Sequence, residues 1–235
     1  MFEQAAQQHF EWHCQVGGIS SDENGLCTGM GCFLAANIIL SAAHVWESIR
    51  NRYEYPLVMH SSGGYRCEVL REWLDWDVIV LRTVQQIRHR QGTDTANEAR
   101  AAFPPLSKER MYLGREVGMF SRLTTIDEQG GRKSQSLFTS SRVSSVQWPK
   151  SEKEKFTYGL SNTVVQRGFS GSAVFLQDGS VVGVLVQCIS FPIDLENLSW
   201  GRYVLPLVSP VYEIRDQIAE LLAQEHSVNH IKARI

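Results

Sequence analysis

The sequence lacks a strong charge of either sign, a long apolar run and a targeting segment. Its formal net charge is −2, so no strong electrostatic field draws it to nucleic acid or to an anionic membrane. The longest apolar stretch, CFLAANIILSAAHV, contains Asn37 and is too short to span a membrane. The opening residues, MFEQAAQQHFEWHCQ, have no basic region followed by an apolar one, so they do not match a secretory signal. We therefore expect neither nucleic acid nor a membrane as a partner.

Cysteine is also scarce and irregularly placed. The chain contains five cysteines, an odd number without a Cys-x-x-Cys pair, at Cys14, Cys27, Cys32, Cys67 and Cys188. This pattern argues against a disulfide framework and favours reduced thiols, most of them small buried side chains, in the cytoplasm. Because a zinc site needs paired ligands, we expect neither a metal ion nor a cofactor.

What the sequence does contain is a series of short apolar segments separated by turns. With 235 residues, of which 43% are hydrophobic, the chain can bury the core of one large or two small domains, and all-β barrels commonly reach this length. Ala36–Asn37 and Asp178–Gly179 are turn signals. The apolar patterns predict strands within GMGCFLAANIILSAAHV, YPLVMHSSGGYRCEVLREW, DVIVLR, GREVGMFSRL, LFTSSRVSSVQW, SAVFLQDGSVVGVLVQC and GRYVLPLV.

The predicted strands fall into two groups. Residues 87–110 are polar, include Pro104 and Pro105, and are predicted to link the two halves. The charged segments 124–135 and 149–156 are predicted to be solvated loops.

Helices are predicted only near the two ends of the sequence. Residues 2–13 show a weak helical stripe. Near the other end, Ser209 is predicted to cap a helix whose first turn contains Pro210. Its apolar face would be formed by Val211, Ile214, Ile218, Leu221 and Leu222.

Ser170, in the stretch QRGFSGSAVF, is a candidate nucleophile. A serine hydroxyl needs a base, usually histidine, and the imidazole needs a carboxylate that holds its tautomer. Of the seven histidines, only His44 directly follows an apolar strand, in LSAAHV. Asp77, in LDWDVIVLR, opens a buried strand, where a carboxylate requires a partner, and Asp75 is its competitor. Each residue also has a simpler interpretation, as a strand-end histidine, a solvated aspartate or a serine in a glycine-rich turn.

Three motifs in one order resemble the trypsin-like, chymotrypsin-fold serine proteases: LSAAHV, DWDVIVLR and GFSGSAVF followed by VVGVLV. The resemblance implies that His44 is the base, Asp77 the orienting acid and Ser170 the nucleophile. It also implies an oxyanion hole formed by the backbone N–H groups of Gly168 and Ser170. The fold it implies is all-β, with two six-stranded β-barrels and a C-terminal α-helix. The expected limits are 1–235 for the whole unit, 15–86 and 112–208 for the barrels and 209–225 for the helix.

One departure from the digestive members concerns activation. They carry an aspartate just before the nucleophile, where this chain has Phe169, which cannot pair with a newly formed N-terminal amine. We therefore expect packing of Phe169, rather than amine insertion, to order Val165–Ser170. In this respect the chain is more similar to bacterial and intracellular members.

Position relative to the same motifs also implies a substrate-binding pocket. It lacks an aspartate at its base, which disfavours Lys or Arg and favours an apolar side chain before the cleaved bond. The expected pocket residues are Val164, Val165, Val186, Gln187, Cys188 and Gly201.

The favoured function is a serine endopeptidase that cleaves a protein or peptide substrate through an acyl-enzyme intermediate, with an activating protein partner as a further option. The alternative is a catalytically silent or partner-gated binding module with a protease fold. A non-peptidase hydrolase using the same triad is a third, weaker interpretation.

Overall fold

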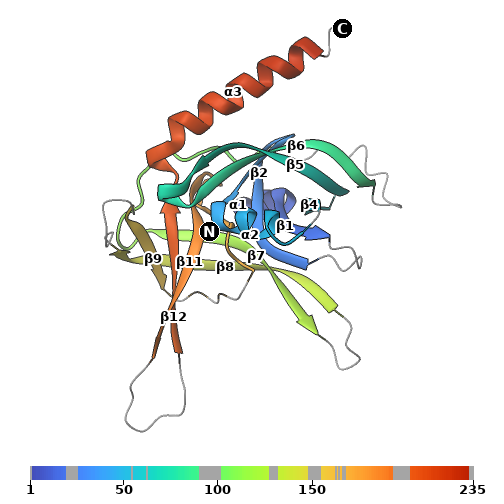
Figure 1. Ribbon diagram of the computed structural model, residues 1–235. Coiled ribbons are helices and arrows are strands. Elements are labelled where there is room, and N and C mark those ends of the chain that lie inside the picture. Colours follow the sequence, from blue (N-terminus) through green and yellow to red (C-terminus); the bar gives the residue numbers. More distant parts are fainter. Residues whose placement is uncertain are drawn as a thin grey trace.

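Within the residues that it describes, the computed structural model forms two closed six-stranded antiparallel β-barrels and three α-helices, and this arrangement, shown in Figure 1, confirms the predicted fold class. In the described part of the chain, no helix combines the length and the apolar character needed to cross a membrane. The structure describes residues 2–19, 26–53, 55–61, 63–89, 102–126, 132–147, 155–161, 163, 165, 168–192 and 202–232.

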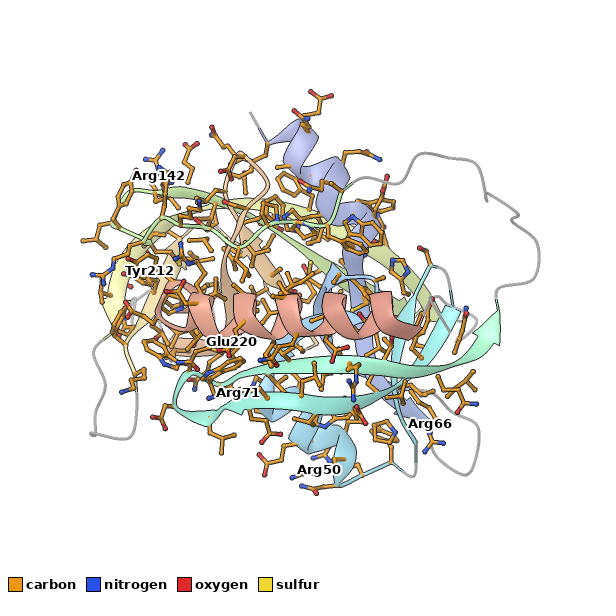
Figure 2. All side chains as sticks on the ribbon, turned by 90° about the horizontal axis from the view of Figure 1, so that it is seen from above. Arg50, Arg66, Arg71, Arg142, Tyr212 and Glu220 are labelled. Atoms are coloured by element: carbon orange, nitrogen blue, oxygen red, sulfur yellow. The ribbon has the colours of Figure 1, made fainter. Side chains whose placement is uncertain are left out.

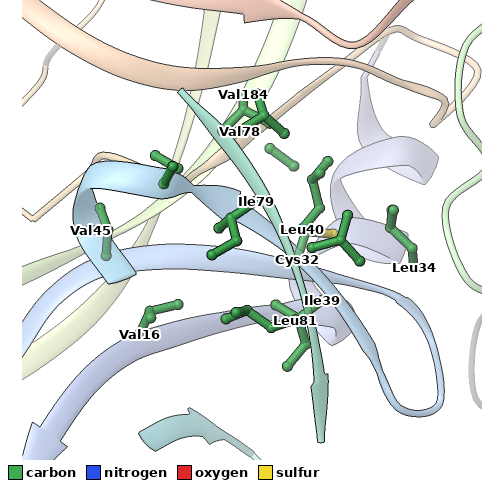
Figure 3. Close-up of a cluster of buried hydrophobic side chains, with 14 of the residues drawn as sticks. Val16, Cys32, Leu34, Ile39, Leu40, Val45, Val78, Ile79, Leu81 and Val184 are labelled. Carbon is green, nitrogen blue, oxygen red and sulfur yellow. The ribbon is translucent and has the colours of Figure 1, made fainter. Parts of the chain in front are cut away.

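The first barrel has the strand order β1-β2-β3-β6-β5-β4. Ile39 and Leu40 of β3 lie beside Ile79 and Leu81 of β6 in its core, and all four are almost fully buried (Figure 3). β3 pairs with β6 as far as Ala42↔Val78, so the residues that follow β3 lie next to those that precede β6. The strands are β1 His13–Ile19, β2 Leu26–Ala35, β3 Ile38–Ala42, β4 Tyr55–His60, β5 Gly63–Trp73 and β6 Val78–His89.

The second barrel has the order β10-β11-β12-β9-β8-β7 and packs against the first, with β10 on β2 and β11 on β3. Val184 and Val186 of β11 belong to the same buried cluster as Ile39 and Ile79, so the cores of the two barrels are continuous at this contact. The strands are β7 Glu116–Ile126, β8 Arg132–Gln147, β9 Thr157–Ser161, β10 Ala173–Phe175, β11 Val181–Pro192 and β12 Arg202–Pro210.

Two expectations about the second half are wrong. Part of segment 124–135 is not a loop, because β7 pairs with β8 as far as Ile126↔Arg132. Ser209 and Pro210 do not begin a helix, because Pro210 still pairs with Gly183 in the sheet. β9 was not predicted, and most of segment 149–156 lies outside the described residues. The observed barrels span His13–His89 and Glu116–Pro210.

The helices lie on the outside of the barrels. The weak stripe at residues 2–13 forms α1, Glu3–Trp12, as predicted, whereas α2, Ala43–Arg50, was not predicted. A 3-10 helix, η2 (Tyr212–Ile214), leads into α3, Arg215–Lys232. Figure 2 shows α3 lying along β5 and β6, and Arg82 of β6 forms an ion pair with Glu225 of α3. The last helix therefore returns from the second barrel to cover the first.

Candidate active site

His44 and Asp77 meet where β3 and β6 end side by side. His44 is the second residue of α2, and Asp77 follows a short 3-10 helix, η1 (Leu74–Trp76), immediately before β6. The distance from His44 Nδ1 to Asp77 Oδ2 is 2.5 Å. Because a carboxylate only accepts hydrogen bonds, Nδ1 carries a proton, and in the neutral imidazole Nε2 is then the acceptor. The His44 side chain is 45% exposed, so a substrate can reach it.

Asp77 also caps α2. Ala42, which precedes this helix, offers no side-chain hydrogen bond to the first-turn N–H groups. Asp77 supplies the acceptors instead. Its backbone carbonyl accepts a hydrogen bond from Ala43 N–H at 3.0 Å, and its Oδ1 accepts one from His44 N–H at 2.8 Å. A negative charge is favourable at this positive end of a helix. The Asp77 carboxylate thus binds both the backbone N–H and the imidazole of His44, so the backbone contact fixes the position of the carboxylate relative to the ring.

Asp75, the competing acid, lies within η1 and is exposed. Among the described residues, Asp77 accepts a hydrogen bond from the imidazole of His44, and Asp75 does not. The geometry therefore brings His44 together with Asp77 rather than with Asp75.

Ser170 lies on the turn that leads into β10, and this turn touches the first barrel. Its carbonyl oxygen accepts from Met30 N–H at 2.7 Å. Gly29, just before Met30, has no room for a side chain: a Cβ there would lie 2.7 Å from Ser170 O and 2.5 Å from Val45 Cγ1. Gly29 thus brings the turn of Ser170 against the residue that follows His44. Among the described residues, no hydrogen bond joins Ser170 Oγ to His44.

Glycine is required on both sides of Ser170. Gly168 and Gly171 have φ values of 92° and 89°, a region that other residues rarely adopt. A Cβ on residue 171 would also overlap with the carbonyl oxygen of Met30. Between the two glycines, Phe169 is 1% exposed within the core of the second barrel. Packing of Phe169 therefore anchors the turn, as expected from the sequence.

The expected pocket residues are only partly described. Val164 and Gly201 lie outside the described residues. Val165 is half-buried against the second core, and Val186 is buried at a β-bulge, where its side chain contributes to packing. Gln187 and Cys188 are exposed on β11, so these two residues are accessible to a substrate.

Gly29 and the capping of α2 were not predicted from the sequence. In the sequence, Gly29 is one of the glycines in an apolar strand. Its role becomes clear only in the folded structure, where it lies against Ser170. In the described ranges, no group of three or more His, Cys, Asp or Glu side chains is placed to hold a metal ion.

Residues 29–184 match the model of the trypsin-like peptidase domain, and the chain belongs to this family. Among solved structures, it resembles the active form of the Rv3671c protease from M. tuberculosis with a TM-score of 0.53 and 14% identity, covering 92% of this chain and 82% of that one. An inactive form of Rv3671c from M. tuberculosis H37Rv gives a TM-score of 0.52 at 14% identity, covering 93% and 90%. These likenesses show the fold. No curated protein sequence matches the chain.

Proposed function

We propose that this chain is a serine endopeptidase in which Ser170 is the nucleophile, His44 the base and Asp77 the orienting acid. The observation that carries the proposal is the contact between His44 Nδ1 and Asp77 Oδ2, at 2.5 Å. In the neutral form of this exposed imidazole, the contact places the proton on Nδ1, so that Nε2 can accept a proton as a general base must. Ser170 comes from the other barrel, on a turn that Met30 holds beside α2.

The chemistry follows from these roles. His44 Nε2 takes the proton of Ser170 Oγ while Oγ attacks the carbonyl carbon of the peptide bond. Collapse of the tetrahedral intermediate breaks the C–N bond, and the imidazolium returns the proton to the leaving amine. Water then attacks the acyl-enzyme with the same base and releases the acid product and Ser170. Asp77 stabilises the imidazolium and holds its orientation.

The turn around Ser170 supplies the second element of the proposal. The N–H groups of Gly168 and Ser170 are the proposed donors to the oxyanion, because the positive φ of Gly168 allows successive N–H groups to turn toward one side. The proposed substrate is a protein or peptide with an apolar residue before the cleaved bond. The odd number of cysteines is the basis for proposing a reducing, cytoplasmic compartment.

Labelling with a fluorophosphonate probe tests the proposal. The probe should modify the wild-type protein at Ser170 and leave Ser170→Ala unmodified, with the modified peptide identified by mass spectrometry. A wild-type protein that stays unlabelled, alone and after addition of peptide or protein substrates, would instead indicate a catalytically silent binding module. Cleavage of a peptide library then gives the preferred side chain before the cleaved bond.

A further inference from the structure

An aromatic contact connects the two barrels beside the proposed acid. The rings of Trp76 and Phe156 are 5.5 Å apart at an interplanar angle of 84°, an edge-to-face arrangement. Trp76 packs against the core of the first barrel, and Phe156 packs against the core of the second. Phe156 in turn meets Tyr158 of β9 edge-to-face at 5.7 Å. The contact is thus a bridge from β9 to the residue adjacent to Asp77.

The turn that carries Asp77 is attached at both ends to elements from the second half of the chain. Trp73, at the start of the turn, donates from Nε1 to Gln217 Oε1 of α3 at 2.5 Å. Trp76, at its end, contacts Phe156. Between them Leu74 is 69% exposed and Asp75 is exposed, so neither side chain anchors the turn. The two tryptophans therefore provide the side-chain anchors of this segment.

The backbone of Asp77 has a conformation that this anchoring can stabilise, in addition to the bonds from Ala43 N–H and His44 N–H. With φ 51° and ψ 40°, Asp77 is the one non-glycine residue with positive φ among the described residues. A left-handed conformation is less favourable than a right-handed one even for an aspartate, and it persists where the surroundings impose it. Its own N–H bonds Leu74 O at 3.1 Å, which is the short-range constraint on the turn. A loosened turn can relax this conformation and move the carboxylate away from His44.

We infer that Trp76 is a positioning residue: its edge-to-face contact with Phe156 holds Asp77 in the left-handed conformation in which the carboxylate fixes the tautomer of His44. The inference rests on the proposed function for its effect on catalysis. It adds that an aromatic residue beside β9 in the second barrel controls the base in the first barrel through Trp76.

The test compares two ways of removing an aromatic ring from the second barrel. Phe156→Leu removes the ring that faces Trp76 and keeps an apolar side chain. Phe120→Leu is the control, because Phe120 is an aromatic residue of the same barrel that packs with Phe138 and Phe175 instead of with Trp76. Trp76→Leu and the conservative Trp76→Phe complete the set. Urea unfolding confirms that each variant is folded under the assay conditions.

The principal readout is the protonation of the two ring nitrogens of His44, measured by ¹⁵N NMR of histidine-labelled protein without substrate. The resonances are assigned by comparison with His44→Gln. In the wild type, Nδ1 should carry the proton. Phe156→Leu and Trp76→Leu should give a mixture of tautomers and lower kcat by about tenfold with little change in KM. Trp76→Phe should keep most of the wild-type tautomer and of the wild-type kcat. Phe120→Leu should leave the tautomer and kcat unchanged.

Two results would overturn the inference. One is a Phe156→Leu protein with wild-type tautomer and kcat, and the other is a Phe120→Leu protein that changes as much as Phe156→Leu. The NMR measurement needs no activity, so it separates this inference from the proposed function. If the wild type neither reacts with the fluorophosphonate nor cleaves peptides, the proposed function fails, and the tautomer alone decides for or against Trp76.

Discussion

At Asp77 one carboxylate binds a backbone N–H group through one oxygen and an imidazole through the other. Stabilisation of α2 and orientation of His44 therefore come from the same side chain. Substitutions can separate these effects, because the cap needs only an acceptor whereas the imidazole needs an acceptor at one defined nitrogen.

Asp77→Asn should keep much of the stability and lose the activity. Its amide oxygen can still accept from His44 N–H, but its NH₂ group donates toward Nδ1 and forces the opposite tautomer. We expect kcat to fall by about 10³–10⁴-fold. Asp77→Ala should show a similar loss of kcat and an additional loss of about 1 kcal/mol in the free energy of unfolding, because the helix cap is gone. Steady-state kinetics and urea unfolding of both variants measure the two effects; an Asn variant with near-wild-type kcat would contradict this role of Asp77.

Ser170 and His44 should act as one unit. Ser170→Ala and His44→Ala should each lower turnover by roughly 10³-fold or more, and the double variant should lose little further. The reason is that a hydroxyl without its base and a base without its hydroxyl are equally unable to form the acyl-enzyme. The kcat values of the three proteins, measured on one peptide, test this. Losses that multiply in the double variant would show that the two residues work independently.

At the scale of elements, α1 is attached to the second barrel through a buried histidine. His9 of α1 is 2% exposed, its ring stacks on Phe175 at 3.8 Å, and its Nε2–H donates to Gly179 O at 2.8 Å. Burial away from water lowers the pKa of His9 from 6.5 to about 4, although the hydrogen bond to Gly179 acts in the opposite direction. The folded protein therefore holds this imidazole neutral at pH values at which the unfolded chain would protonate it.

Stability should consequently fall on mild acidification. Below about pH 6.5 the unfolded chain binds a proton at His9, whereas the folded chain binds it only near pH 4. Because the unfolded state binds more protons in this window, the free energy of unfolding decreases as the pH falls from 6.5 to 4, by up to about 3 kcal/mol from this group. Urea unfolding at several pH values measures the slope. His9→Gln should be less stable at pH 7 and show a shallower slope; an unchanged slope would assign the acid sensitivity to other groups.

The elements differ in how far local sequence determines them. β3 and β6 could be predicted because continuous apolar runs such as Ile-Ile-Leu are buried on both faces. α2 could not, since it has eight residues and its cap, Asp77, lies in the turn before β6, far away in the sequence. β9 is a five-residue strand with a central glycine, which gives too short a pattern. At Ser209 and Pro210, the local helix-start signal is outweighed by pairing of β12 with β11.

The candidate site divides in the same way. His44, Asp77 and Ser170 could be chosen because each motif combines a chemical group with a characteristic flanking pattern. The contacts that position them could not, because Gly29 against Ser170 and Trp76 against Phe156 join residues that are far apart in the sequence. Such contacts depend on how the two barrels pack, which no local pattern encodes.

At the scale of the whole molecule, the structure bears on how the site could be activated. An amine at Val16 or Ile19 would have to leave β1 to reach the turn of Ser170. Val16, however, is fully buried and paired with Gly29 on one side and Val58 on the other. Extracting this strand would open the first barrel. Beside the nucleophile, the chain has Phe169, which is buried in the second core and cannot pair with an amine.

Removal of residues 1–12 should therefore lower stability without raising activity. The deletion takes away α1, whose His9 and Ala5 are buried, but leaves β1 and the turn of Ser170 complete. We expect a lower free energy of unfolding and a kcat/KM no higher than that of the full chain. A second deletion that starts the chain at Val16 cuts into β1 and should be less stable still. If either deletion raised kcat/KM about a hundredfold, equivalent to about 2.8 kcal/mol in the barrier, an N-terminal amine would be forming the oxyanion hole after all.

Phe169→Ala gives the complementary measurement in the full chain. Loss of its packing should disorder the turn of Ser170 and lower kcat/KM, while ¹⁵N NMR should still show the His44 tautomer of the wild type.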